Sequence, residues 1–127
     1  MNKYIKQLWL DALESGKYQQ CQHQLCVVEN MDDKYCCLGV LTDLYIQSLE
    51  GQVNNAQWEL NSTVKIFKSK TCGGQSKVLP HEVSEWAGLN GTSNPMIKHD
   101  AAAGSCGDLN DNGHTFQYIA NCIKEVL

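Results

Sequence analysis

The sequence predicts a mainly helical α+β fold, formed by a single globular domain over residues 1–127. Three segments carry the three-to-four-residue spacing of apolar side chains that is typical of amphipathic helices. Two β-branched and aromatic runs in the middle of the chain, separated by a polar pair, predict a small antiparallel β-hairpin or sheet. The length is that of an ordinary domain, and 43% hydrophobic residues suffice for one buried core.

The three long helices are each defined by an apolar stripe. The first, capped by Asn2 and ended by Gly16, buries Ile5, Leu8, Trp9, Ala12 and Leu13. The second, closed by Gly51, buries Cys37, Val40, Leu41, Leu44, Tyr45 and Leu49. The last begins at His114 or Thr115 and buries Phe116, Ile119, Ala120, Ile123, Val126 and Leu127. Trp9 and Trp86 are expected in the core, and Trp58 is expected to be partly exposed.

Shorter elements lie between these helices. Strands are predicted at residues 24–29, 57–60 and 63–68, with turns at 30–33 and 61–62. Tyr35–Cys36 is either a further strand or the entry to the second helix. A short helix starts at Pro80 and stops at Gly88, residues 70–77 form a flexible loop, and Ala101–Ala103 is predicted as one helical turn.

Composition narrows the class of partner. The net charge is −4, and all ten basic residues are lysine, so the chain lacks the bidentate donor that commonly reads phosphate and guanine. Only Lys65, Lys68 and Lys70 cluster, as a solvated face of a strand. We therefore expect no binding to nucleic acid. No signal peptide or membrane span is visible, which predicts a cytosolic protein without membrane contact, and the seven cysteines are expected mostly as small buried hydrophobes.

Two segments resemble metal sites without completing them. Asp108–Gly113 matches the start of a calcium loop, but the twelfth position, Ile119, cannot supply the required carboxylate, so the segment favours a turn that caps the last helix. Cys21, His23 and Cys26 are compact soft ligands that Cys36 or Cys37 could supplement. Regular zinc spacings are absent, however, and we expect neither a metal nor any other cofactor.

One arrangement points to catalysis. A cysteine at a helix N-terminus, Cys36 or Cys37, has its thiolate stabilised by unpaired backbone N–H groups. A histidine (His81, His99 or His114) could act as the base, oriented by Asn110 or Asp111. The alternative function is thus a cysteine-dependent hydrolase or transferase with Cys36, His114 and Asp111. Adjacent cysteines opening a buried helix are more often packing residues, which favours a non-enzymatic protein.

Four blocks of the chain, in order, resemble small bacteriophage-encoded proteins of unknown function. The blocks are Leu13–Gln20, Tyr35–Leu44 with LGVLTDL, Leu79–Leu89 with LPHEVSEWAGL, and Leu109–Phe116 with LNDNGHTF. The resemblance covers most of the chain and implies a phage or prophage origin and the cytoplasm of an infected host cell. It implies no particular chemistry.

The leading hypothesis is a phage accessory protein that binds a host protein or a small signalling metabolite, in host takeover or anti-defence. Its binding surface is expected from polar and aromatic residues near the helix ends and in the hairpin: Lys17, Tyr18, Gln20, Trp58, Asn110 and Asp111. A virion or regulatory structural component is a further alternative, and self-association into a homo-oligomer stays open.

Overall fold

The computed structural model describes all of residues 1–127 and has the α+β architecture that the sequence predicts. The helices are α1 (Lys3–Glu14), α2 (Cys37–Gln47), α3 (Leu49–Val53), α4 (His81–Trp86), α5 (Cys106–Asp111) and α6 (Phe116–Val126). The strands are β1 (Gln19–Gln20), β2 (Cys26–Glu29), β3 (Asp32–Tyr35), β4 (Gln57–Asn61) and β5 (Val64–Lys68). No helix is both long enough and apolar enough to cross a bilayer.

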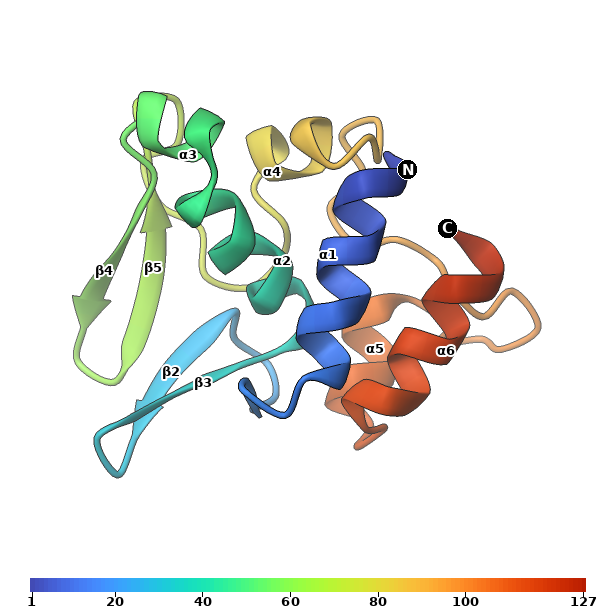
Figure 1. The fold of residues 1–127 in the computed structure, drawn as a ribbon. Helices are drawn as coiled ribbons and strands as arrows, with labels where there is room; N and C mark the ends of the chain where they lie inside the picture. The colour runs from blue at the N-terminus through green and yellow to red at the C-terminus, as the bar shows by residue number, and fades with distance from the viewer.

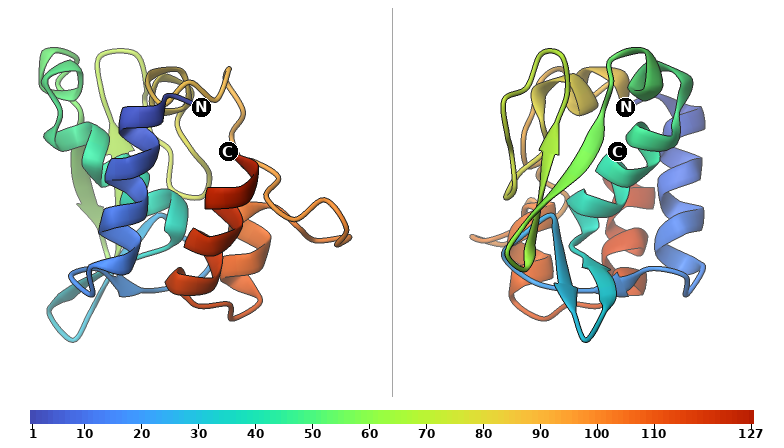
Figure 2. Two further views of the ribbon diagram at one scale, coloured as in Figure 1. Left: turned by 45° about the vertical axis from the view of Figure 1, so that its right-hand side comes forward. Right: turned by 90° about the vertical axis from the view of Figure 1, so that its left-hand side faces the viewer.

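The strands form one sheet in the order β1-β3-β2-β5-β4, in which every pairing is antiparallel except that of β1 with β3. Figure 1 shows the two hairpins on one side of the molecule and α1, α5 and α6 on the other, with α2 between them. Helix α2 contacts α1, α3, α4, α5 and β3, which explains why its sequence is apolar around most of its circumference. Figure 2 shows the same arrangement from two further sides.

Most of the predicted stripe residues lie in the core, but Leu49 and Val126 are exposed, by 79% and 39%. The second helix also ends earlier than predicted, at Gln47, and Leu49 opens the separate helix α3. Trp9 of α1 and Ile119 of α6 are fully buried, and the indole Nε1 of Trp9 donates to the Cys37 carbonyl at 3.0 Å. Trp86, expected in the core, is only half-buried and packs against Tyr45, with 5.3 Å between ring centroids. Trp58 is half-buried, which agrees with its expected partial exposure.

The hairpins differ in detail from the prediction. The first turn is shorter than expected, because Asp32 already belongs to β3. Of the pair Tyr35–Cys36, Tyr35 ends the strand β3 and Cys36 is the N-cap of α2, so each alternative holds for one residue. Lys65 and Lys68 point to opposite faces of β5, pairing with Asp33 and Glu59 at 2.9 Å each, so the predicted single lysine face does not form.

Three local predictions are wrong. Residues 108–111 lie in α5 rather than in a turn, and the cap of α6 is Thr115, whose hydroxyl accepts from the Tyr118 N–H at 3.1 Å. Ala101–Ala103 forms a turn, not a helix. The loop after β5 is held to the sheet rather than loose, because Phe67 and Gln75 exchange two backbone hydrogen bonds of 2.8 and 3.0 Å.

Candidate functional site

The carboxylate of Asp43, in the second half of α2, lies among side chains that the sequence prediction named for binding. Its Oδ2 accepts the Tyr18 hydroxyl and the Gln47 Nε2, each at 2.7 Å. Its Oδ1 accepts the Trp58 indole Nε1 at 2.9 Å. One half-buried carboxylate therefore joins the segment after α1, the helix α2 and the strand β4.

Aromatic rings surround this carboxylate, and we call Tyr18, Tyr35, Asp43, Gln47 and Trp58 the Asp43 cluster. Tyr18 and Tyr35 meet edge to face, with 5.0 Å between centroids, and Tyr35 lies 6.3 Å from Trp58. All three rings are half-buried. Edge-to-face pairs of this kind stabilise a fixed arrangement, so the cluster is a rigid and partly exposed surface.

The electrostatics of the cluster keep its donors protonated. Burial, followed by the hydrogen bond to Asp43, raises the pKa of the Tyr18 hydroxyl well above its ordinary value. Burial and the charge of Asp43 also raise the pKa of Tyr35. Asp43 takes part in none of the ion pairs of the chain, so its charge is met only by neutral hydrogen-bond donors.

A shallow hollow of about 310 Å³ adjoins this cluster, between the end of α1 and α2. It is lined by Asp11, Ala12, Ser15, Lys17, Tyr18, Leu44 and Gln47. Tyr18 and Gln47 belong to both the hollow and the Asp43 cluster. The predicted binding residues Lys17, Tyr18 and Trp58 thus lie in one region of the surface, whereas Gln20, Asn110 and Asp111 lie in another.

Asn110 lies elsewhere and is fully buried, in contrast to the exposed position expected from the sequence. Its Oδ1 accepts the Cys37 N–H at 3.1 Å and the Gln20 Nε2 at 2.9 Å, and its Nδ2 donates to the Cys21 carbonyl at 2.8 Å. Both ends of the carboxamide are therefore satisfied inside the chain, which makes Asn110 and Gln20 residues that connect segments.

Asp111 faces the loop before β2. One of its oxygens accepts the His23 backbone N–H at 2.8 Å, and the other lies 3.5 Å from the His23 Nδ1. His23 itself has a left-handed backbone with φ 72°, which the hydrogen bond to Asp111 helps to hold. Asp111 thus stabilises a turn, although its side chain is also partly exposed.

The thiols at the start of α2 are buried. Cys36 caps the helix through its Sγ, which accepts the Gly39 N–H at 3.4 Å, and burial raises its pKa. Cys37 donates its S–H to the Cys106 carbonyl at 3.2 Å, and burial raises its pKa as well. These environments favour the unreactive thiol over the thiolate that a nucleophile requires.

The predicted catalytic partners of Cys36 make other contacts. The His114 ring stacks on Tyr118 with centroids 4.3 Å apart, and Asp111 is paired with His23 instead of His114. Cys36 forms no hydrogen bond with a histidine. The structure therefore does not assemble Cys36, His114 and Asp111 into the arrangement that the alternative function needs.

The cysteines of the segment before β2 are likewise bound within the chain. The Cys21 thiol donates toward the Gln24 and Lys34 carbonyls, at 3.5 and 3.4 Å, and Cys26 is fully buried. No three histidine, cysteine or carboxylate side chains lie in an arrangement that could hold a metal ion.

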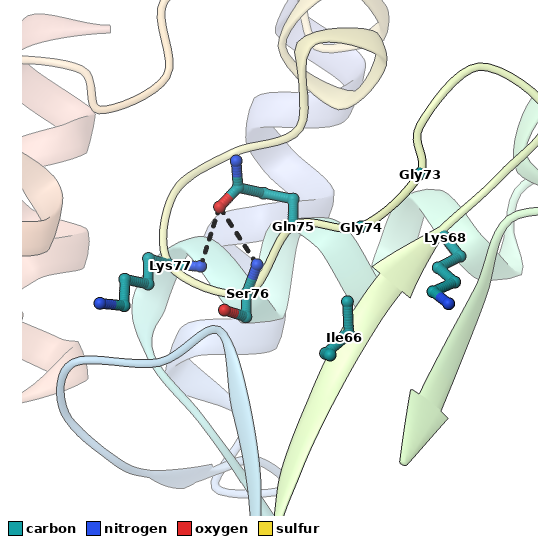
Figure 3. Close-up of a pocket in the computed structure, with 7 residues that line it drawn as sticks. All are labelled: Ile66, Lys68, Gly73, Gly74, Gln75, Ser76 and Lys77. Atoms are coloured by element: carbon teal, nitrogen blue, oxygen red, sulfur yellow. Dashed lines mark hydrogen bonds between the residues drawn. The ribbon is translucent and has the colours of Figure 1, made fainter. Parts of the chain in front are cut away.

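A second hollow, of about 360 Å³, lies where residues 73–77 cross β5 (Figure 3). The Gln75 Oε1 accepts the backbone N–H groups of Ser76, Lys77 and Val78, at 3.1, 3.1 and 3.4 Å. These donors are thus occupied by the chain itself. Because the hollow has one hydrophobic lining residue, Ile66, it offers little apolar area to a ligand.

Sequence reasoning missed Asp43, Tyr35 and Gln47. A carboxylate on an apolar helix was the available signal, since Asp43 interrupts the buried stretch from Cys37 to Tyr45. The role of Asp43 depends on Tyr18 and Trp58, which come from distant segments. No spacing rule connects Asp43 with either of them.

Comparison with known proteins places the chain in a family without assigning an activity. No curated protein and no solved structure matches it. One family matches over residues 1–127, a domain of unknown function (DUF8296), and the chain belongs to that family.

Proposed function

We propose that this chain is a phage-encoded, non-enzymatic accessory protein that binds a host protein in the cytoplasm of an infected cell, in host takeover or anti-defence. The phage origin is supported by the resemblance of four ordered sequence blocks. Binding rather than catalysis is supported by the buried, high-pKa thiols at the start of α2.

The observation that carries the proposal is the Asp43 carboxylate, which three neutral donors hold rigidly at the surface without a cation of the chain. A lysine or arginine from a partner can pair with such a carboxylate and stack on the neighbouring rings. Tyrosine and tryptophan are also the residues most enriched where protein interfaces are strongest. The net charge of −4 favours approach of a basic surface.

A protein partner fits this surface better than a metabolite. The hollows have volumes of about 310 to 360 Å³, at the small end for ligand sites, and none is enclosed by the chain. A bound metabolite would keep much of its surface in water. A partner protein can instead cover the cluster and the adjoining hollow together, which excludes water from the charge pair.

The test is affinity capture from a host bacterial lysate with the wild-type chain, Asp43→Asn and Glu125→Gln. The two substitutions remove the same charge, but Glu125 is exposed on α6 and makes no hydrogen bond or ion pair. We expect Asp43→Asn to retain at least tenfold less of the captured partner, whereas Glu125→Gln retains it. Equal capture by all three chains contradicts the proposal.

The metabolite form of the hypothesis has its own readout. In a thermal-shift screen against nucleotides, a saturating ligand that adds about 2 kcal/mol or more of stability identifies a small-molecule site instead. We expect no nucleotide to reach that value, because no hollow encloses one.

A further inference from the structure

Strand β4 is an edge of the sheet whose outer side has no partner strand. It pairs only with β5, and it is the outermost strand in Figure 1. The opposite edge, β1, is two residues long and offers little to pair with. Natural edges are usually blunted by proline, charged side chains or a bulge. Strand β4 has no proline and no bulge over its five residues, and Glu59 is its one charged residue.

The register shows which backbone groups of β4 face outward. Asn61 and Val64 close a two-residue turn, so they form a hydrogen-bonded pair, and the pairs at Trp58 and Leu60 are of the non-hydrogen-bonded kind. In such a pair, the N–H and C=O groups of both residues point away from one another.

The opposite side of β5 agrees with this register. Phe67, which lies across from Trp58, exchanges its two backbone hydrogen bonds with Gln75 on the far side. The N–H and C=O groups of Trp58 and Leu60 make no hydrogen bond within the chain. Four backbone groups are therefore available to an added strand.

The side chains of β4 alternate between the two faces of the sheet, and this alternation indicates which residues a pairing strand should carry. Trp58 and Leu60 point to one face, where Asp43 fixes the indole and Leu60 is 58% exposed. Glu59 points to the other face, where it pairs with Lys68 at 2.9 Å and keeps 56% of its side chain exposed. A strand that pairs with β4 would therefore gain from apolar residues beside Trp58 and Leu60 and from a basic residue opposite Glu59.

A second copy of the chain fits this pattern poorly. Antiparallel pairing of two β4 strands uses all four backbone groups only if Trp58 of each copy lies opposite Leu60 of the other. That register places the two Glu59 side chains directly opposite one another, each already paired with its own Lys68, so like charges meet and no charge complementarity is gained across the new pair. Registers centred on Trp58 or Leu60 avoid this arrangement but overlap over fewer residues.

We propose that β4 takes up an extended segment of the partner protein as a sixth strand, with a basic residue opposite Glu59 between two apolar residues. The inference rests on the proposed function, since it assumes that the partner is a protein, and it adds how that partner docks. Backbone hydrogen bonds supply affinity, and alternate side chains supply specificity.

The test selects binders from a displayed library of random heptapeptides and compares Leu60→Pro with Leu60→Thr. Proline removes the outward N–H at an edge position that tolerates it, whereas threonine keeps it. We expect selected peptides with an apolar–basic–apolar core, which bind Leu60→Pro at least tenfold more weakly than Leu60→Thr, since both variants lack the leucine side chain and only the proline lacks the N–H. A selection without that core, or equal binding by Leu60→Pro and Leu60→Thr, overturns the proposal.

A second variant tests the proposal even if a proline at position 60 destabilises the fold. Glu59→Lys should bind the selected basic peptides at least tenfold more weakly and prefer peptides with a central glutamate. An unchanged peptide preference of Glu59→Lys contradicts the proposal. A wild-type dimer that light scattering detects and that Leu60→Pro abolishes also contradicts it, because the edge is then filled by a second copy. If lysate capture depends on Asp43 but not on Leu60, the strand proposal fails while the proposed function stands.

Discussion

At the scale of single residues, the buried carboxamide of Asn110 stabilises the fold by satisfying backbone groups of distant segments. Replacing it with alanine leaves the Cys37 N–H and the Cys21 C=O without partners in the core. We expect Asn110→Ala to lower the free energy of unfolding by about 3 kcal/mol, measured by urea denaturation. The control is Asn112→Ala, at an exposed side chain without hydrogen bonds, which should change it by less than about 0.5 kcal/mol. Similar effects of both substitutions would contradict this role of Asn110.

The thiols give a second prediction at this scale. In the native chain near neutral pH, iodoacetamide should label Cys72 and Cys122, which are half-buried, long before Cys36 and Cys37, which are buried with raised pKa values. Mass spectrometry of the digested protein gives the order of labelling, and unfolding in urea should equalise the rates. Rapid labelling of native Cys36 would instead favour the cysteine-dependent enzyme.

Single-residue expectations from the sequence succeeded where the local pattern decides exposure. Trp58 lies in a weakly apolar strand and is half-buried as predicted. The predicted exposure of Asn110 is wrong. A polar residue among other turn-forming residues gives no local sign that it satisfies backbone groups up to 89 residues away. Asp43 was missed for the same reason, since its partners Tyr18 and Trp58 lie on other elements.

At the scale of elements, the amphipathic helices α1 and α6 follow from the sequence, since apolar residues spaced three and four apart share one face only in a helix. Helix α5 does not follow, because Asp108, Asn110 and Asp111 are weak helix formers typical of turns. It forms because Ser105 caps it and because Leu109 and Asn110 are buried against neighbouring segments. Tertiary contacts therefore override local propensity there.

A testable element-scale claim concerns Gly39, inside the LGVL block of α2. A Cβ at this position would overlap the carbonyl of Leu25, whose backbone crosses the helix. We expect Gly39→Ala to cost about 3 kcal/mol of stability despite the higher helix propensity of alanine. Gly73→Ala, where a Cβ meets nothing, should stay within about 0.5 kcal/mol. Thermal melts of both variants check this, and a stable Gly39→Ala would show that the two backbones can separate.

At the scale of the whole molecule, the buried thiols link stability to alkaline pH. Burial raises the pKa of both Cys21 and Cys26 from about 9 to about 12, so the unfolded chain ionises first as the pH rises. Their contribution to stability is complete below pH 9 and is lost between about 9 and 12. The urea midpoint of the reduced protein should fall in this window, and less steeply in Cys26→Val. A midpoint that is constant from pH 8 to 11 would contradict the assignment.

The central claim is that the chain acts through the face formed by the Asp43 cluster and the edge of β4. The most direct measurement is oxidative footprinting of the purified chain and of the same chain in the complex captured from host lysate, with modification of each residue read by mass spectrometry. The account predicts that Tyr18, Trp58 and Leu60 become protected while Tyr4 and Met96, which are exposed elsewhere, do not. Unchanged modification of Tyr18 and Trp58 in the complex would contradict it.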